Sequence, residues 1–588
     1  MRSARGEVTD QGVGMETKKD ALSRHFGRFA PVLELRGGET LARAGQPLGA
    51  LYKLEAGRIG ELSPGAAGAG PGAGRLAVVH RPGAVIGGLE ALRDGIHRSD
   101  LVALRDSRLR LLPIRKAESL LRRDAHVLAE VARGALRRVA GEDAQPPRGG
   151  SILGFVSVTE RLFMRRFVEA IAQGALRLGV RTVVLGAEAQ NLTAVELSRL
   201  EDEHDLVLLA AEFGERDFAA FCHRQIDRLI LVGDLKAASL ADPALVPAAL
   251  SAHRLMDVIL VHPPGSRAPS GAETWLGRLP ASRLFHVHEN AAASMDRLAR
   301  IYCGRSVGLV LSGGGARAYS HAGVVRALRE LGAPIDFVAG NSMGAIVAAG
   351  VAMGWDDEEM DARLHDAFVA SSPLNDIAFP VLAMTHGREV EARLERHFGD
   401  VRIGDLWRPF ACVSTDLTDG VAHVHRDGLL REALRASLSL PGVLPPVIRD
   451  GHVLVDGAMV DNLPVDLVKA WHDGPTIGVD VGHAEGLKPQ DLELHPSPAA
   501  WLASGAWKHG PPIVSVLIRA ATVGAEAAVR ATHDALDLVL LPQLDSIGLQ
   551  DWKAYAPAVD AGYRSVMDKA ESVSALLSGR DRAPAYEG

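Results

Sequence analysis

The chain has 588 residues, enough for three or four domains, and its 47% hydrophobic and 23% charged content is ordinary for a folded globular protein. A net charge of −7 offers no basic surface for nucleic acid, and three widely spaced cysteines without a C-x-x-C pair exclude a disulfide framework. Residues 1–7 contain no apolar signal segment, so we expect a cytoplasmic protein.

Residues 21–140 begin with short apolar runs separated by glycine turns, such as 33–41, 51–58 and 82–88. This spacing predicts the short strands of a β-roll, followed by helical sequence from about residue 115 to 138. The segment therefore forms the first expected domain.

This first segment resembles a cyclic-nucleotide-binding domain, in which a glutamate holds the ribose hydroxyl and an arginine holds the cyclic phosphate. Arg98 matches the arginine, whereas Gly88 stands at the glutamate position and Glu90 is two residues out of register. The resemblance implies a cyclic nucleotide as ligand, with Arg98 contacting its phosphate, although losing the carboxylate should weaken binding. The alternative is a domain that serves packing or dimer contacts, with Arg98 a surface or salt-bridged side chain.

Residues 141–150 are rich in proline and glycine and predict a linker. From 151 to 298 strands and helices alternate, which predicts a parallel sheet covered by helices. Its expected strands are 152–156, 182–185, 206–209, 229–232 and 258–261.

The first turn of this parallel domain, 157–161, contains no glycine, so we expect no phosphate loop. We interpret the segment as a degenerate parallel α/β domain with a structural or regulatory role. Two His-Val-His pairs, 286–288 and 423–425, each place two imidazoles on one strand face. Without a clear carboxylate or cysteine partner they do not predict a metal site.

Three glycines, Gly313, Gly314 and Gly315, lie between an expected strand at 307–311 and a helical pattern that ends near Gly332. Bare backbone N–H groups in such a loop can bind an oxyanion, and the nearby Arg317 adds positive charge. The alternatives are a plain glycine turn or a nucleotide-phosphate loop. The nucleotide motif G-x-G-x-x-G fails because Ala318 stands at its third glycine.

The pentapeptide Gly340–Gly344 has the form G-x-S-x-G and lies between a β-branched apolar run and a small-residue apolar stretch. Strand, sharp turn and helix in this order are typical of a turn that presents a serine nucleophile, here Ser342. A second match, Gly304–Gly308, leads into a strand and not out of one. We therefore interpret Ser306 as an ordinary turn serine; for Ser342 the alternative is likewise a Gly/Ser turn.

Asp456 ends the apolar run 453–455 and precedes Gly457. A carboxylate at a strand end is well placed as a base that reaches a serine on another strand. The alternative for this residue is a simple Asp-Gly turn.

Together, the glycine loop, the G-x-S-x-G turn and Asp456-Gly457-Ala458 resemble the patatin-like phospholipase family, from about Val307 to about Tyr563. The match includes the runs 414–420 and 435–446, and the second of these is similar to bacterial relatives of neuropathy target esterase. Several of those relatives carry a cyclic-nucleotide-binding domain upstream.

The resemblance implies a three-layer α/β esterase core over residues 305–580 that works with a serine–aspartate dyad. Ser342 would be the nucleophile and Asp456 the general base. The implied oxyanion hole consists of Gly313, Gly314, Gly315 and Arg317. Two departures from the family pattern, Ala318 and Asp461, are not expected to abolish activity.

The C-terminal region contains Trp501, Trp507 and Leu517, which would suit a bilayer interface, core packing or a lid over the acyl pocket. A final strand is expected at 536–541 and a closing helix at 555–577.

The sequence thus predicts a cytoplasmic serine esterase that hydrolyses carboxylic esters of phospholipids or lysophospholipids without metal or cofactor. It would meet its substrate either in dispersed form or at a membrane surface, where a peripheral position at the inner face is expected. The alternatives are a regulatory protein with a silent esterase core and a regulator that acts mainly through its N-terminal domain. Acyl chain, head group, sn-1 or sn-2 preference and oligomeric state are left open.

Overall fold

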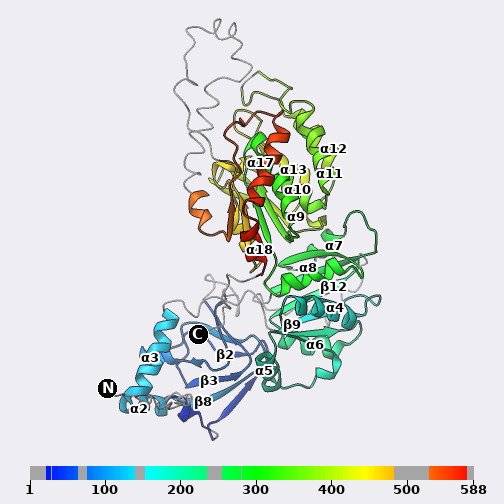
Figure 1. Cartoon of the computed structure of the whole chain (residues 1–588). Coiled ribbons are helices and arrows are strands. Elements are labelled where there is room, and N and C mark those ends of the chain that lie inside the picture. The colour runs from blue at the N-terminus through cyan, green and yellow to red at the C-terminus, as the bar shows by residue number, and fades with distance from the viewer. Residues whose placement is uncertain are drawn as a thin grey trace, which may run out of the picture.

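The computed structural model describes residues 22–27, 29–63, 76–139, 152–234, 255–279, 281–379, 381–482 and 529–578. Figure 1 shows a β-roll at one end of the molecule, a large mixed sheet at the other and a parallel sheet between them. The predicted linker 141–150 and the aromatic region with Trp501, Trp507 and Leu517 lie outside the described residues.

The β-roll consists of two four-stranded antiparallel sheets, in the orders β1-β8-β3-β6 and β2-β7-β4-β5. Leu54 of one sheet and Ile59 of the other are fully buried and belong to one hydrophobic cluster, whereas Leu51 is buried against the helices beside the roll. The roll is built from β1 (Val32–Leu35), β2 (Thr40–Ala42), β3 (Ala50–Ala56), β4 (Ile59–Leu62), β5 (Leu76–His80), β6 (Val85–Ile86), β7 (Asp100–Ala103) and β8 (Ser107–Pro113), with η1 (Leu22–Phe26) and α1 (Gly88–Leu92).

The helical sequence after the roll forms two helices, α2 (Ile114–Arg123) and α3 (Ala125–Val139). They are separated by Asp124, whose backbone is extended and whose Oδ1 accepts the N–H of His126 at 2.9 Å. An aspartate in this role stabilises a new helix start, which explains the break.

The middle sheet has six strands in the order β10-β11-β9-β12-β13-β14, and every pair is parallel. All five predicted strands are present. The sixth strand, β14, was not among them, because its sequence was noted only for the two histidines that it would place on one strand face. β11 and β12 are buried along their whole length, as continuous apolar runs in a covered parallel sheet should be. The elements are β9 (Ile152–Ser157), α4 (Met164–Arg177), β10 (Thr182–Leu185), η2 (Ala187–Ala189), α5 (Ala194–Glu203), β11 (Leu206–Ala211), α6 (Arg216–Gln225), β12 (Arg228–Gly233), β13 (Leu255–His262), α7 (Ala272–Leu276), β14 (Arg283–His288) and α8 (Ala292–Tyr302).

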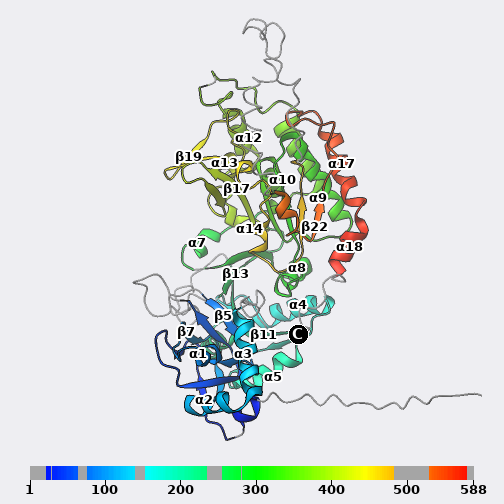
Figure 2. The same cartoon turned by 90° about the vertical axis from the view of Figure 1, so that its left-hand side faces the viewer.

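The C-terminal core contains an eight-stranded sheet in the order β19-β20-β17-β16-β15-β21-β22, with β18 also paired to β17. The strands from β17 to β22 on this path are parallel, and β18, β19 and β20 extend the sheet in antiparallel fashion. Figure 2 shows helices on both sides of this sheet, so the predicted three-layer α/β class is confirmed.

The strands of this core are β15 (Gly308–Leu311), β16 (Phe337–Asn341), β17 (Phe410–Asp416), β18 (Val421–His425), β19 (Val447–Arg449), β20 (His452–Asp456), β21 (Thr476–Val479) and β22 (Leu538–Leu540). The helical elements are η4 (Gly315–Tyr319), α9 (Ser320–Glu330), α10 (Ser342–Met353), α11 (Asp357–Leu364), η5 (His365–Val369), α12 (Arg388–Phe398), η6 (Ile403–Asp405), α13 (Leu430–Ser437), η7 (Gly457–Met459), α14 (Val465–Lys469), α17 (Tyr555–Met567) and α18 (Ala570–Ser578). The expected closing helix is therefore two helices. Within the described ranges, no helix has the length and apolar character needed to cross a bilayer.

The middle sheet and the C-terminal core share one hydrophobic cluster, in which the rings of Phe285 on β14 and Phe337 on β16 lie 6.1 Å apart, edge to face. The β-roll meets the middle sheet through charges: Arg58 and Arg105 both bind Glu201 of α5 at 3.0 Å. We propose residues 21–140, 151–298 and 305–580 as the three domains, the second and third joined by this common core.

Candidate active site

Ser342 stands at the sharp turn between β16 and α10, and its φ of 51° lies in the left-handed region that serine rarely adopts. A Cβ at Gly344 would approach the carbonyl oxygens of Ser312 and Leu311 to 2.4 and 2.5 Å, so the turn is pressed against the end of β15. Strain of this kind persists only where the surroundings enforce it, and it often marks a functional site. The turn leaves Ser342 half-buried at the carboxyl end of the sheet.

Asp456 ends β20, and its Oδ2 accepts a hydrogen bond from the Oγ of Ser342 at 2.7 Å. Its other oxygen, Oδ1, accepts the backbone N–H of Ala458 at 2.9 Å and the side-chain N–H of Asn341 at 3.2 Å. The sheet brings these distant residues together because β17 lies between β16 and β20, with Val413 paired to Asn341 and Ser414 to Asp456.

Burial raises the pKa of Asp456 to about 6, while the hydrogen bonds from Ser342, Ala458 and Asn341 oppose that rise. The carboxylate is therefore mostly ionised at neutral pH and is a stronger base than an exposed aspartate. Among the described residues, no histidine is hydrogen-bonded to Ser342 or Asp456. The geometry allows direct proton transfer from serine to aspartate.

The glycine loop packs directly on the serine, since a Cβ at Gly313 would lie 3.0 Å from the Cβ of Ser342. The N–H of Gly313 is engaged, because it donates to Oδ1 of Asn462 at 3.1 Å. The N–H groups of Gly314 and Gly315 donate to no acceptor within the described part of the chain. These two amides are therefore the ones in the loop that are open to a ligand oxygen.

The far end of the glycine loop is fastened to residues 547–549. Arg317 donates through Nε to the carbonyl of Ile547 at 2.6 Å, and the N–H of Ala316 donates to the carbonyl of Leu549 at 2.9 Å. Gly315 has a φ of 54°, and a Cβ there would meet the Leu549 oxygen at 2.2 Å. Arg317 thus supports the loop backbone. The oxyanion role of Gly313, Gly314, Gly315 and Arg317 stays a prediction, in which the N–H of Gly313 is already bonded to Asn462.

Three polar residues of the site had no role assigned from the sequence: Asn341, Ser437 and Asn462. Ser437 accepts the N–H of Ser342 at 2.9 Å and donates to Asn341 at 3.1 Å. Asn462 accepts from both Gly313 and Asn341 through Oδ1. Ser437 and Asn462 lie within or beside the motif runs 435–446 and 456–458, which is the only sequence signal that could have found them.

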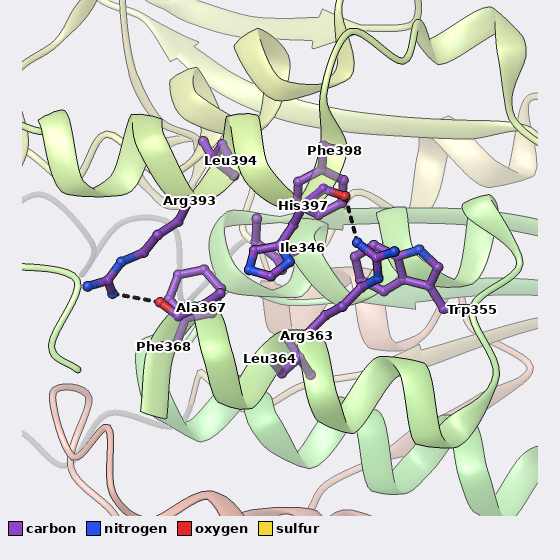
Figure 3. A pocket seen from close by; sticks show the side chains of 10 residues that line it. All are labelled: Ile346, Trp355, Arg363, Leu364, Ala367, Phe368, Arg393, Leu394, His397 and Phe398. Atoms are coloured by element: carbon purple, nitrogen blue, oxygen red, sulfur yellow. Dashed lines mark hydrogen bonds between the residues drawn. The ribbon is translucent and has the colours of Figure 1, made fainter. Parts of the chain in front are cut away.

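A small cavity adjoins the helix that begins with Ser342. Figure 3 shows Ile346, one turn after Ser342, facing aromatic and aliphatic side chains of α11, η5 and α12. Arg363 and Arg393 line it too, but their guanidinium groups donate to the carbonyls of His397 and Ala367 at 3.1 and 2.6 Å. The remaining lining is Trp355, Leu364, Ala367, Phe368, Leu394, His397 and Phe398. Ser342 itself does not line this cavity.

Neither His-Val-His pair is hydrogen-bonded to Ser342 or Asp456, although Ser414, the strand partner of Asp456, contacts the second pair. His286 is hydrogen-bonded to His262 at 2.8 Å and to the carbonyl of Gly404 at 2.7 Å, which uses both ring nitrogens. His425 is hydrogen-bonded to Ser414 at 2.9 Å. Neither pair has the arrangement of a closed metal site.

A group of three candidate ligand residues lies near the second pair. Atoms of Asp416, Asp419 and His452 come within 4.8 Å of one another. His452 and Asp416 are already hydrogen-bonded to each other at 2.6 Å, which accounts for their approach.

In the β-roll, Arg98 is exposed and forms an ion pair with Asp94, four residues earlier. A Cβ at Gly88 would lie 3.1 Å from Val131 of α3, so this helix covers the position of the expected ribose-binding carboxylate. The structure therefore shows the salt-bridged form of Arg98, and a nucleotide ligand stays a prediction.

Residues 309–469 match the patatin-like phospholipase family. The rat patatin-like phospholipase domain-containing protein 7 is 26% identical over 615 residues, which cover 90% of this chain and 45% of the relative. The fold and these matches define the class of the chain: it is a patatin-like phospholipase, a carboxylic ester hydrolase that acts on lipid.

A more specific assignment comes from a relative of similar length, an NTE family protein of Mycobacterium tuberculosis. It is 30% identical over 573 residues, covering 92% of this chain and 93% of the relative. The chain belongs to the NTE family.

Solved structures similar to this chain match only a part of it. One, described under a cyclic-GMP-dependent signalling pathway in bacterial phytopathogenesis, is 22% identical, covers 21% of this chain and 94% of that chain, and has a TM-score of 0.18. The catabolite activator protein of Thermus thermophilus is 20% identical over 31% of this chain and 81% of that chain, also with a TM-score of 0.18. Because TM-scores this low carry no argument about the fold, the first domain is identified as a β-roll from its own strand order.

Proposed function

We propose that this chain hydrolyses carboxylic esters of phospholipids or lysophospholipids, with Ser342 as nucleophile and Asp456 as general base. The observation that carries the proposal is the 2.7 Å hydrogen bond from Oγ of Ser342 to Oδ2 of Asp456, a carboxylate only 2% exposed. A serine hydroxyl is a weak nucleophile until an adjacent base removes its proton, and this contact supplies the base.

The reaction has two steps. Asp456 takes the proton of Ser342 as Oγ attacks the ester carbonyl, and the protonated carboxyl then gives that proton to the departing alcohol oxygen. Water next attacks the acyl-serine with Asp456 again as base, which releases the fatty acid and restores the serine. Both steps use only side chains, backbone and water.

Each tetrahedral intermediate places a negative oxygen beside the glycine loop. The N–H groups of Gly314 and Gly315 are the proposed donors to it, with Gly313 and Arg317 holding the loop in shape through Asn462 and Ile547. A single such donor typically contributes about 10²–10³ in rate.

The wider setting of the reaction is also proposed. A lipid substrate is met at a membrane surface or in dispersed form, and we propose a cytoplasmic protein that acts peripherally at the inner face of the membrane. Any control by the β-roll would pass through the middle sheet, because Arg58 and Arg105 bind Glu201 there. The Ser342–Asp456 contact supports the esterase over a silent regulatory protein.

The test is covalent labelling with a fluorophosphonate probe, followed by fatty-acid release from lysophosphatidylcholine. Ser342→Ala should abolish both, and Asp456→Asn should abolish release. Ser306→Ala is a matched control, since Ser306 occupies the second G-x-S-x-G but is fully buried. Labelling that persists in Ser342→Ala, or a folded wild type that neither labels nor releases fatty acid, would refute the proposal.

A further inference from the structure

A short apolar loop projects between η5 and α12. We call residues 377–384 the apolar loop. Its side chains of Ile377, Phe379, Val381 and Leu382 are 71%, 87%, 78% and 75% exposed. No Asp, Glu, Lys or Arg occurs from 377 to 387. Large aliphatic and aromatic side chains gathered on an uncharged surface mark an interaction site.

The apolar loop stands on a hydrogen-bonded base. The N–H of Ala378 donates to the carbonyl of Met384 at 2.8 Å, and the N–H of His386 donates to the carbonyl of Asp376 at 2.9 Å. The carboxylate of Asp376 also accepts the N–H of Arg388 at 2.7 Å, at the start of α12. The described residues on either side of the exposed side chains are thus held together by hydrogen bonds.

This base is continuous with the wall of the active site. The N–H of Met384 donates to the carbonyl of Gly442 at 2.9 Å, and Oγ1 of Thr385 donates to the carbonyl of Val443 at 2.8 Å. A few residues earlier, the carbonyl of Ser439 accepts the N–H of Asp456 at 2.9 Å. One short segment, 439–443, therefore contacts both the base of the apolar loop and the backbone of the proposed general base.

The apolar loop lies far from the first domain. Figures 1 and 2 show the segment between α11 and α12 at the end of the C-terminal core remote from the β-roll. The described residues of the β-roll and of the middle sheet therefore do not lie beside the loop.

We propose that the apolar loop docks the protein on a phospholipid bilayer by inserting Phe379, Val381 and Leu382 below the head groups. The inference rests on the proposed function, because docking here would let a lipid ester reach Ser342 without crossing bulk water. The exposed side chains of the loop offer neither charges nor hydrogen-bond donors with which a protein partner would form specific pairs. The chain's net charge of −7 favours a zwitterionic bilayer over an anionic one.

The test is flotation of the full chain with phosphatidylcholine vesicles, in a Ser342→Ala background so that the lipid stays intact. The double change Phe379→Ser and Leu382→Ser should lower the vesicle partition coefficient at least about tenfold. Raising the salt concentration should change binding little, because the contact is apolar. Phe163→Ser is the matched control, a 72% exposed phenylalanine on the middle domain, and should bind like its parent.

A double variant that floats like its parent would overturn the proposal. So would a wild-type dimer that this change converts to a monomer in size-exclusion chromatography, since the loop would then be a self-association surface. In the protein that retains Ser342, the double change should lower the rate at which vesicle phospholipid is hydrolysed relative to the rate at which a soluble ester is hydrolysed. Failure of the esterase proposal would appear separately, as absent fluorophosphonate labelling with flotation unaffected.

Discussion

Asp456→Asn should abolish catalysis and at the same time stabilise the fold at neutral and alkaline pH. An asparagine side chain can keep all three contacts, accepting from Ala458 and Asn341 through its oxygen and donating to the oxygen of Ser342. What disappears is the cost of holding a buried negative charge. Burial raises the pKa of Asp456 from its ordinary 3.8 to about 6, which corresponds to about 3 kcal/mol at about 1.4 kcal/mol per pKa unit.

The pH dependence of this effect has a definite sign. Above pH about 6 the wild-type carboxylate is ionised in the folded state, and the variant should gain the full difference. As the pH falls from 6 towards 3.8, the folded wild type binds the proton first, so the advantage of the variant should fade.

Thermal unfolding at pH 8 and pH 4.5 measures this effect. At pH 8 a gain of about 3 kcal/mol should raise the midpoint of the transition of the esterase core by roughly 6–12 °C, and at pH 4.5 the rise should be much smaller. Ser306→Ala should show no such pH-dependent gain. A variant that is no more stable than wild type at pH 8, or whose advantage is the same at both pH values, would refute the reasoning.

Three further predictions concern the proposed general base Asp456, the glycine loop 313–315 and the β-roll. The kcat/KM for a soluble ester should fall about tenfold per pH unit below pH about 6, because Asp456 is then protonated. Asn462→Ala removes the acceptor that holds the N–H of Gly313 and should lower kcat on the order of 10²-fold with little change in KM, measured by steady-state kinetics. Arg105→Ala breaks a buried ion pair with Glu201 and should cost the roll about 3–5 kcal/mol in thermal unfolding. The exposed pair of Arg98 gives the contrast, since Arg98→Ala should cost under about 1 kcal/mol.

The elements that could be predicted from sequence are those whose signal is local. Every expected strand of the middle sheet is present, because a short continuous apolar run bounded by polar turns rarely forms anything but a buried strand in an α/β protein. The break at Asp124 and the division of 555–577 into two helices were missed, since each depends on one or two residues within a longer helical pattern.

The sequence pointed to Ser342 and Asp456, which the structure brings into hydrogen-bond contact, but not to the polar residues that support them. Ser342 and Asp456 lie at turn motifs whose chemistry is visible in a few adjacent residues. Asn462 becomes recognisable only when β15, β16 and the turn after β20 are brought to one edge of the sheet. Its hydrogen bonds join segments 149 and 121 residues apart, so no local pattern could report them.

The arrangement explains how the fold tolerates two unfavourable features at one point, a serine with a φ of 51° and a buried carboxylate. Each is opposed by contacts that do not depend on the other: Ser437 accepts the N–H of Ser342, and Ala458 donates to Asp456. α10 is buried for almost its whole length, so the turn before it cannot relax by moving the helix. Packing in the core therefore offsets both the strained backbone of Ser342 and the cost of burying Asp456, as the proposed roles of nucleophile and general base require.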